Sequence, residues 1–239
     1  IQNDESVPFS KLVLTTGSSP LRLNVPGADL AGVHTFRDSR DVDLLLTLAA
    51  QKKRVVVVGK GRDQVEVALG GRDVVVTHQA EQKGTGHAVQ QAEEALSGYD
   101  GAVLILYGDT PFVETETLRR MLDRLDGDGG PGVVVLASTP PDPLKYGRII
   151  LGEGDRIAKM VEFKDATEEE RAVRLCNSGM MAVRGKDLFR WLGEVGNDNA
   201  AKEYYLPDIV NIAAAEGREA VVIEGDPYET AGVNSRAEL

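Results

Sequence analysis

Short, uninterrupted runs of valine, isoleucine and leucine recur along this chain, and they constrain its fold more than any other feature. Apolar runs of about four to eight residues without alternation are typical of strands that are buried on both faces of a sheet. Such strands occur where helices cover both sides of a largely parallel sheet. The pattern predicts strands at Lys11–Thr16, Arg54–Val58, Asp73–Thr77, Ala102–Tyr107, Gly132–Ser138 and Val221–Glu224.

Helical periodicity fills several of the intervals between these runs. Asp41 is suited to cap the first predicted helix, and Gly217 is suited to end the last. The alternation of strand and helix predicts an α/β fold, a Rossmann-like and mostly parallel sheet with helices on both faces. The predicted helices are Val42–Ala50, Gly86–Leu96, Thr117–Leu125 and Leu206–Glu216.

The middle of the chain departs from this rhythm. Three predicted strands follow one another there with little helix between them: Arg148–Leu151, Arg156–Val161 and Asn177–Val183. Glycines and acidic residues at 152–155 supply a turn after the first of them. We therefore expect a small antiparallel insertion in the sheet.

Bulk composition excludes some partners. The net charge of −11 argues against a nucleic-acid surface, because phosphate backbones attract clustered lysine and arginine. No apolar run approaches the roughly 20 residues that cross a bilayer, so no membrane partner is expected. Cys176 is the single cysteine and cannot form an internal disulfide, which favours the cytoplasm.

Asp109 is the first candidate for chemistry. It follows the buried run Ala102–Tyr107 and Gly108, so its carboxylate is expected at the carboxyl edge of the sheet, where open α/β sheets bind ligands. A magnesium ion that is bound together with nucleotide phosphates takes one or two such carboxylates. The same residues also suit an ordinary turn before a capped helix, so this motif alone leaves both readings open.

A set of motifs in fixed order adds to this reading. The chain reads Gln-Ala-Glu-Gln-Lys-Gly-Thr-Gly-His at 79–87, Tyr-Gly-Asp at 107–109, Tyr-Gly-Arg at 146–148 and Val-Glu at 161–162, followed by Asn177 and Asn234. In order and approximate spacing these motifs resemble the N-terminal pyrophosphorylase domain of bacterial N-acetylglucosamine-1-phosphate uridylyltransferases. The resemblance runs from residue 53 to residue 239.

The resemblance implies an activity and its ligands. UTP and N-acetylglucosamine 1-phosphate would give UDP-N-acetylglucosamine and pyrophosphate, with Asp109 and Asn234 holding Mg²⁺. The residues implied for the nucleotide are Gln79, Gly84 and Thr85, and those implied for the sugar are Tyr107, Gly108, Gly147, Glu162 and Asn177. His87 is expected to pack or cap, because the family uses no catalytic histidine. Without the β-helix domain of the bifunctional members, a monomer or weak oligomer is expected, with no acetyl transfer.

The first fifty residues break the resemblance. The family opens with a strand and a Gly-x-Gly-Thr-Arg loop that wraps the triphosphate, whereas this chain reads Gly-Ser-Ser-Pro-Leu-Arg at 17–22. Ser19 stands at the second glycine and Leu21 at the arginine, while Pro20 lacks an N–H that a phosphate could use. Arg22, one place late, is the remaining candidate for a catalytic cation in this segment.

This opening segment instead resembles part of an FAD- and NAD(P)-dependent flavoprotein reductase. Lys11–Pro20 is similar to the strand and turn near the flavin, and Arg54–Gly61 to the start of the NAD domain, although Gln64 replaces the third glycine of that fingerprint. We therefore expect a chimera of two segments, 1–52 completing the sheet and 53–239 carrying the uridylyltransferase-like domain. Two alternatives stay open: a UDP-sugar-binding domain without turnover, and a flavoprotein fragment.

Overall fold

The computed structural model describes residues 11–16, 54–59, 74–110, 112–127, 129–143 and 145–232. The strands are β1 (Lys11–Thr16), β2 (Arg54–Gly59), β3 (Val74–His78), β4 (Ala102–Tyr107), β5 (Val133–Ser138), β6 (Arg148–Leu151), β7 (Ile157–Val161), β8 (Cys176–Arg184) and β9 (Ala220–Glu224). The helices are α3 (Thr85–Gln90), the 3₁₀ helix η1 (Glu94–Leu96), α4 (Thr115–Asp126), α5 (Glu168–Ala172), α6 (Gly185–Glu194) and α7 (Asp208–Ala215).

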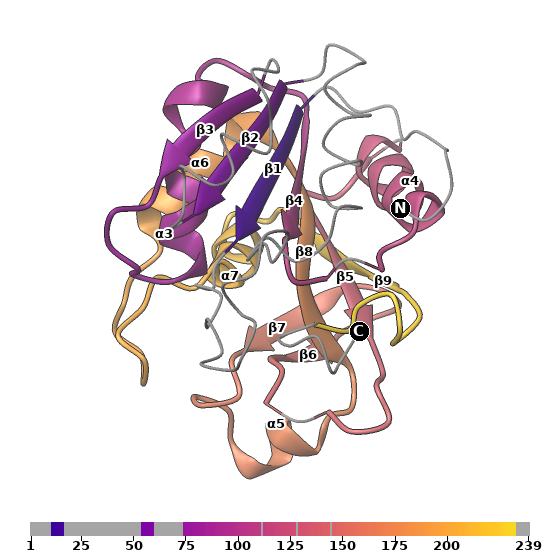
Figure 1. Cartoon of the computed structure of the whole chain (residues 1–239). Coiled ribbons are helices and arrows are strands. Elements are labelled where there is room, and N and C mark those ends of the chain that lie inside the picture. The colour runs from indigo at the N-terminus through magenta and orange to yellow at the C-terminus, as the bar shows by residue number, and fades with distance from the viewer. Residues whose placement is uncertain are drawn as a thin grey trace, which may run out of the picture.

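The strands form one mixed sheet in the order β3-β2-β1-β4-β8-β5-β9 (Figure 1). Four neighbouring pairs, β3 with β2, β2 with β1, β1 with β4, and β5 with β9, are parallel. β8 runs antiparallel to both of its neighbours, β4 and β5. The α/β prediction is confirmed, and β1 lies between β2 and β4 in the same sheet.

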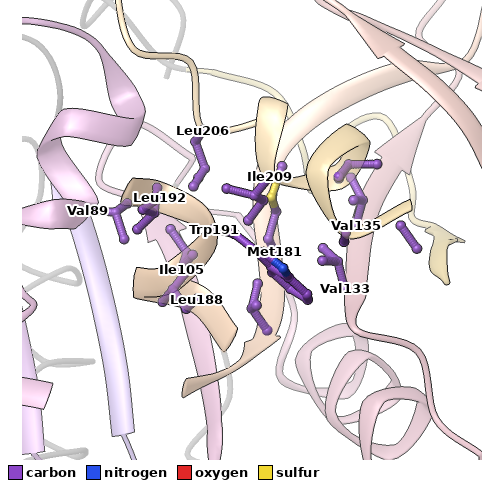
Figure 2. Packing of buried hydrophobic residues seen from close by; sticks show 14 of the residues in the cluster. Val89, Ile105, Val133, Val135, Met181, Leu188, Trp191, Leu192, Leu206 and Ile209 are labelled. Atoms are coloured by element: carbon purple, nitrogen blue, oxygen red, sulfur yellow. The ribbon is translucent and has the colours of Figure 1, made fainter. Parts of the chain in front are cut away.

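Helices cover both faces of the sheet, as its apolar strands require. Alternate residues of β4 enter different clusters: Val103 and Ile105 pack with α3, α6 and α7, whereas Leu104 and Leu106 pack with α4. Trp191 of α6 is fully buried in the first cluster, beside Met181 and Val133 (Figure 2). This burial on both faces explains why the strand sequences show no polar alternation.

The antiparallel insertion is confirmed for β6 and β7, which pair with each other. The assignment of Asn177–Val183 to the same insertion is wrong in its main part. Only Cys176, at the start of β8, pairs with β6, while the rest of the strand enters the central sheet. A register shift between Val135 and Ala137 of β5 accompanies this change of partner. Because every residue from Ser178 to Val183 is apolar or small, the pattern of this strand cannot reveal which neighbours it joins.

The helix predictions need three corrections. The predicted helix Gly86–Leu96 is interrupted, because Gln91, Ala92 and Glu93 donate to carbonyls three residues back and tighten the winding between α3 and η1. Helices α5 and α6 were not predicted. Gly217 ends α7 with φ of +74°, as predicted, while Asp41 and Val42–Ala50 lie outside the described residues.

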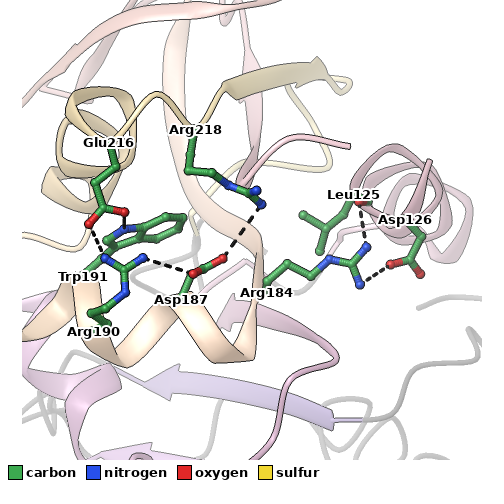
Figure 3. Close-up of polar contacts among 8 residues, drawn as sticks. All are labelled: Leu125, Asp126, Arg184, Asp187, Arg190, Trp191, Glu216 and Arg218. Atoms are coloured by element: carbon green, nitrogen blue, oxygen red, sulfur yellow. Dashed lines mark hydrogen bonds and ion pairs between the residues drawn. The ribbon is translucent and has the colours of Figure 1, made fainter. Parts of the chain in front are cut away.

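An ion-pair network fastens α6 to the end of α7 (Figure 3). The indole Nε1 of Trp191 donates to Glu216 Oε2 at 2.9 Å, and Arg190 bridges Glu216 and Asp187. The network anchors the helix pair that carries the larger apolar cluster. Among the described residues, no helix is long and apolar enough to cross a membrane.

Candidate functional site

The carboxyl end of β4 is the centre of the candidate site. Directly after Tyr107 the chain turns, because the backbone N–H and the hydroxyl of Thr110 both donate to the Tyr107 carbonyl, at 3.3 and 3.0 Å. Gly108 and Asp109 occupy this turn and are half-buried. Asp109 is therefore held at the edge of the sheet, where the sequence predicted it.

The loop between β3 and α3, predicted to bind the nucleotide, is fastened to a distant segment of the chain. Lys83 accepts a hydrogen bond from Tyr204 N–H at 2.7 Å, and Tyr204 in turn accepts one from Gly86 N–H at 2.8 Å. Thr85 Oγ1 accepts from the N–H of Leu206 at 2.9 Å. The predicted nucleotide loop is thus held against the segment that leads into α7.

Gly84 is required at its position in this loop. Its φ is +107°, and a Cβ atom would lie 2.6 Å from the Tyr204 carbonyl oxygen. Its own carbonyl accepts the Nε2 of Gln79 at 3.2 Å and the N–H of Ala88 at 3.1 Å. Gln79 is 3% exposed, so this buried amide and the glycine turn form one rigid unit.

Tyr107 connects the three groups of predicted ligands. Burial raises the pKa of Tyr107 well above its ordinary value, a hydrogen bond with the Thr85 side chain partly offsets this rise, and the charges of Glu162 and Asp109 add to it. Its ring lies against Gly179, where a Cβ would come within 2.4 Å of Tyr107 Cε2. Thr85 therefore contacts the phenol of Tyr107, and the charges of Glu162 and Asp109 act on it.

The predicted sugar residues of the insertion also lie together. The N–H of Asn177 donates to the Gly147 carbonyl at 3.0 Å, and its Oδ1 accepts from Gly179 N–H at 2.9 Å. Glu162 lies beside Gly147, with Oε1 at 3.4 Å from the position of a Cβ there. A bulkier residue at 147 would therefore press on the Glu162 carboxylate.

The charge around this cluster is strongly acidic. Burial raises the pKa of Glu162, and the neighbouring carboxylates Asp208, Asp165 and Glu203 raise it further, while Lys164 lowers it. Burial and then Asp165 raise the pKa of Asp208 in the first turn of α7. Burial, followed by the charges of Asp165, Glu162 and Glu203, raises the pKa of Tyr205 to about 12. The site is thus suited to accept hydrogen bonds from hydroxyl groups.

The predicted metal and cation residues can be followed only in part. Asn234 and Arg22 lie outside the described residues, as does the loop at 17–22. Across the described ranges, no group of three or more histidine, cysteine or acidic side chains is arranged to hold a metal ion. Asp109 nevertheless fits the role of a single carboxylate ligand, because it is half-buried at the strand end and hard oxygen donors suit Mg²⁺.

Arg148 and Gly179 support the site but were not predicted as part of it. Arg148 is 3% exposed and donates to the carbonyl oxygens of Tyr146, Pro143 and Arg171, so it braces the turn that carries Gly147. Gly179 has φ of +86° under the Tyr107 ring. The sequence held a signal for Arg148, because an arginine stands there between Gly147 and an apolar pair. The role of Gly179 depends on its contact with Tyr107 on another strand, which the sequence does not show.

Comparison with known proteins identifies the family. A family model described as the MobA-like NTP transferase domain matches residues 42–175, more than half of the chain. The chain belongs to the MobA-like NTP transferase domain family.

The relatives named here share one description. "Bifunctional protein GlmU" of Sphingopyxis alaskensis is 62% identical over 187 residues, which are 78% of this chain and 41% of the relative. The proteins of the same name from Rhizorhabdus wittichii and Zymomonas mobilis are 60% and 52% identical over 187 residues each. The chain therefore spans about two fifths of the length of these relatives.

The chimera reading gains no support from these comparisons. None of the relatives named here is described as a flavoprotein, and the match to the NTP transferase domain already begins at residue 42. The boundary between residues 52 and 53 lies outside the described residues and stays a prediction.

Proposed function

We propose that this NTP transferase domain forms UDP-N-acetylglucosamine and pyrophosphate from UTP and N-acetylglucosamine 1-phosphate. The observation that carries the proposal is the position of Tyr107, which contacts Thr85 and lies in the field of Glu162 and Asp109. Residues expected for the nucleotide, the sugar and the metal thus all act on one side chain at the end of β4, which supports a shared site. The identity to relatives described as bifunctional protein GlmU supports the same choice.

The nucleotide base would be read by Gln79 and Gly84. A uracil edge offers an N–H donor beside a carbonyl acceptor, and it needs the opposite pair from the protein. The amide of Gln79 and the backbone of Gly84 are close enough to share a hydrogen bond of 3.2 Å, and both are held rigidly. Thr85 would support this loop through its bond with Leu206 rather than reach the base itself.

The sugar would lie between the insertion and Tyr107. Glu162 and Asn177 both lie next to Gly147, where the Glu162 carboxylate would accept hydrogen bonds from sugar hydroxyls. Gly147 and Gly108 would allow the ligand to approach the backbone closely. The acidic surroundings of Glu162 favour a neutral sugar there over a phosphate.

The reaction itself requires positioning and charge neutralisation rather than a nucleophilic side chain. An oxygen of the sugar phosphate would attack the α-phosphorus of UTP, form the new P–O bond and release pyrophosphate. Asp109 and Asn234 would hold Mg²⁺, which neutralises phosphate charge when bound. Arg22 would supply a further positive charge. We place the reaction in the cytoplasm and expect a monomer or weak oligomer.

A second function is supported by a specific observation. Residues 17–22 lack the glycine and arginine positions that wrap a triphosphate in the resembled family, so the domain could bind the sugar nucleotide without turning over. Release of pyrophosphate from UTP and N-acetylglucosamine 1-phosphate, measured with Mg²⁺, tests the first function. Tight binding of UDP-N-acetylglucosamine without release would favour the second, and absence of both would overturn the assignment.

A further inference from the structure

The side-chain amide of Gln79 is held by its nitrogen alone. Nε2 donates to the Gly84 carbonyl at 3.2 Å and lies 3.0 Å from Nδ1 of His87. Among the described residues, none donates a hydrogen bond to Oε1, and this oxygen is not one of the fully buried side-chain atoms without a partner. Within the described part of the chain, the oxygen is therefore the end of the amide to which a ligand can donate.

The contact with His87 fixes the state of the imidazole ring. An amide nitrogen can only donate, so Nδ1 must accept and the ring must be neutral, with its proton on Nε2. Gln91 Nε2 also lies 3.4 Å from the ring, at His87 Nε2, but it donates to the His87 carbonyl at 2.9 Å. The shorter contact, between Gln79 and Nδ1, assigns the tautomer, and the Glu81 backbone forms a further hydrogen bond with the ring.

The imidazole ring of His87 lies beside the segment that holds the nucleotide loop. His87 belongs to α3, and Gly86 immediately before it donates to the Tyr204 carbonyl at 2.8 Å. The ring lies 6.4 Å from the Tyr204 ring, between centroids. The same segment that fastens the nucleotide loop therefore also lies beside the imidazole ring.

We propose that His87 is a positioning residue that sets the base selectivity of the site by fixing the orientation of the Gln79 amide. The proposal rests on the proposed function above. With both N–H bonds of Nε2 engaged, Gln79 presents an acceptor to the ligand. Gly84 N–H, for which no described residue supplies an acceptor, presents a donor in the same turn.

This acceptor and donor complement one pyrimidine and oppose the other. Uracil offers N3–H and O4, a donor beside an acceptor, whereas cytosine offers the unprotonated N3 and its amino group in the reverse order. A flipped Gln79 amide would present a donor and lose this distinction. The Gly84 carbonyl holds the Gln79 amide in its orientation by one hydrogen bond, and His87 Nδ1 adds a second.

Binding of UTP and CTP to the whole chain, measured by calorimetry with Mg²⁺ present, tests the proposal. We expect the parent to bind UTP more tightly than CTP. His87→Ala should weaken UTP binding by roughly three- to tenfold, the effect of one neutral hydrogen bond, and should narrow the ratio of UTP to CTP affinity. In turnover, the change should appear in KM for UTP more than in kcat.

Two further variants separate positioning from a general effect on the fold. His87→Asn places Oδ1 where Nδ1 stands and should restore the parent ratio, because it keeps the acceptor. Gln91→Ala removes the contact on the other side of the ring and should leave the ratio unchanged. Two outcomes would overturn the role of His87. One is a His87→Ala variant with the parent ratio of UTP to CTP affinity. The other is a His87→Asn variant that unfolds at the parent temperature but is as unselective as His87→Ala.

The outcome for the parent protein separates this inference from the proposed function. A parent that binds UTP no better than CTP would overturn uridylyl transfer as the function, and the role of His87 with it. A parent that prefers UTP, combined with a His87→Ala variant of equal preference, would overturn the role of His87 and leave the proposed function standing.

Discussion

The N–H of Asn177 donates a 3.0 Å hydrogen bond to the carbonyl of Gly147. This bond joins the start of β8 to the turn before β6, at the point where β8 leaves the insertion for the central sheet. The predicted sugar residues of the insertion are therefore tied to the same strand that passes under Tyr107. Movement of the insertion would alter the sugar side of the site together with its centre.

Glu162→Gln should weaken the binding of the sugar nucleotide. Loss of a hydrogen bond to a charged group costs about 1.5–3 kcal/mol, or roughly ten- to a hundredfold in affinity. Calorimetric titration with UDP-N-acetylglucosamine measures the change. Glu153→Gln, at an exposed turn position, is the matched control and should leave the affinity unchanged.

Glu162→Gln should increase the stability of the fold at pH 7, although it weakens binding. Because the pKa of Glu162 is raised in the folded protein, the folded state holds more protons than the unfolded chain above the ordinary glutamate value. Stability then falls as pH rises through this range. Glu162→Gln should therefore unfold at a higher temperature than the parent at pH 7, with the difference disappearing at acid pH. An identical pH profile for the two proteins would contradict the raised pKa.

Gly179→Ala should destabilise the protein more than the same change at Gly154. Both glycines have positive φ, +86° and +66°, so alanine costs roughly 1–2 kcal/mol at either position. At Gly154 nothing lies within 4 Å of the new Cβ, whereas at Gly179 the Tyr107 ring is 2.4 Å away, which adds about 1–3 kcal/mol of overpacking. Urea unfolding of the two variants gives the comparison, and equal losses would show that the Tyr107 ring yields without cost.

Lowering the pH should weaken uracil selectivity through His87. Burial lowers the pKa of His87, Lys83 lowers it further, Glu81 raises it, and Tyr204 is the titratable ring that faces it. At a pH just below the ordinary histidine pKa, the folded state therefore holds fewer protons than the unfolded chain. The stability that neutral His87 contributes above this pH is lost as the pH falls. The ratio of UTP to CTP affinity should fall in the parent over the same range. In His87→Asn it should stay constant, and a parallel decline there would assign the effect to another group.

Asp109→Ala should abolish the gain in sugar-nucleotide affinity that Mg²⁺ gives the parent. Of the two proposed Mg²⁺ ligands, the half-buried carboxylate of Asp109 lies within the described residues, at the end of β4. It lies outside the two apolar clusters. Titrations with and without Mg²⁺ measure this gain, with Asp123→Ala on the exposed face of α4 as the charge-matched control. Equal affinity with and without the ion in the parent would contradict the metal assignment.

Replacing residues 11–27 with the strand, Gly-x-Gly-Thr-Arg loop and Pro-Lys segment of the resembled family should raise turnover far more than affinity. One preorganised donor to a developing charge contributes about 3–4 kcal/mol, or two to three powers of ten in rate. Pyrophosphate release by the two proteins measures the difference. A parent as fast as the replaced protein would show that Arg22 or another cation already supplies the charge.

The sequence predicted the sheet well where strands are bounded by turns and buried on both faces. β1 and β4 begin and end at the predicted residues, because each apolar run stops at a polar or glycine residue. Helix α5 carries a capping box between Thr167 and Glu170, and α6 has apolar residues at Leu188, Trp191 and Leu192, so signals for both were present. The partners of β8 depend on contacts that no local pattern encodes.

For the candidate site, the sequence predicted the residues but not the contacts that hold them. The order of motifs pointed to Gln79, Gly84, Tyr107 and Glu162, and the structure brings these residues to one region of the sheet. The bonds that hold the loop join Lys83–Gly86 to Tyr204–Leu206, far along the chain, and could not be predicted from local pattern. The bond between Gln79 and His87 lies within nine residues, yet only side-chain geometry could reveal it.

The position of β1 between β2 and β4 has a consequence for how the chain is made. Lys11 lies opposite Arg54 on one side and Val103 on the other, so β1 waits for one of its partner strands until residue 107 has emerged from the ribosome. Until then its apolar edge stays unpaired, the condition that favours association with other chains. Pauses in translation before residue 107 should therefore trap more aggregated nascent chain than pauses after it.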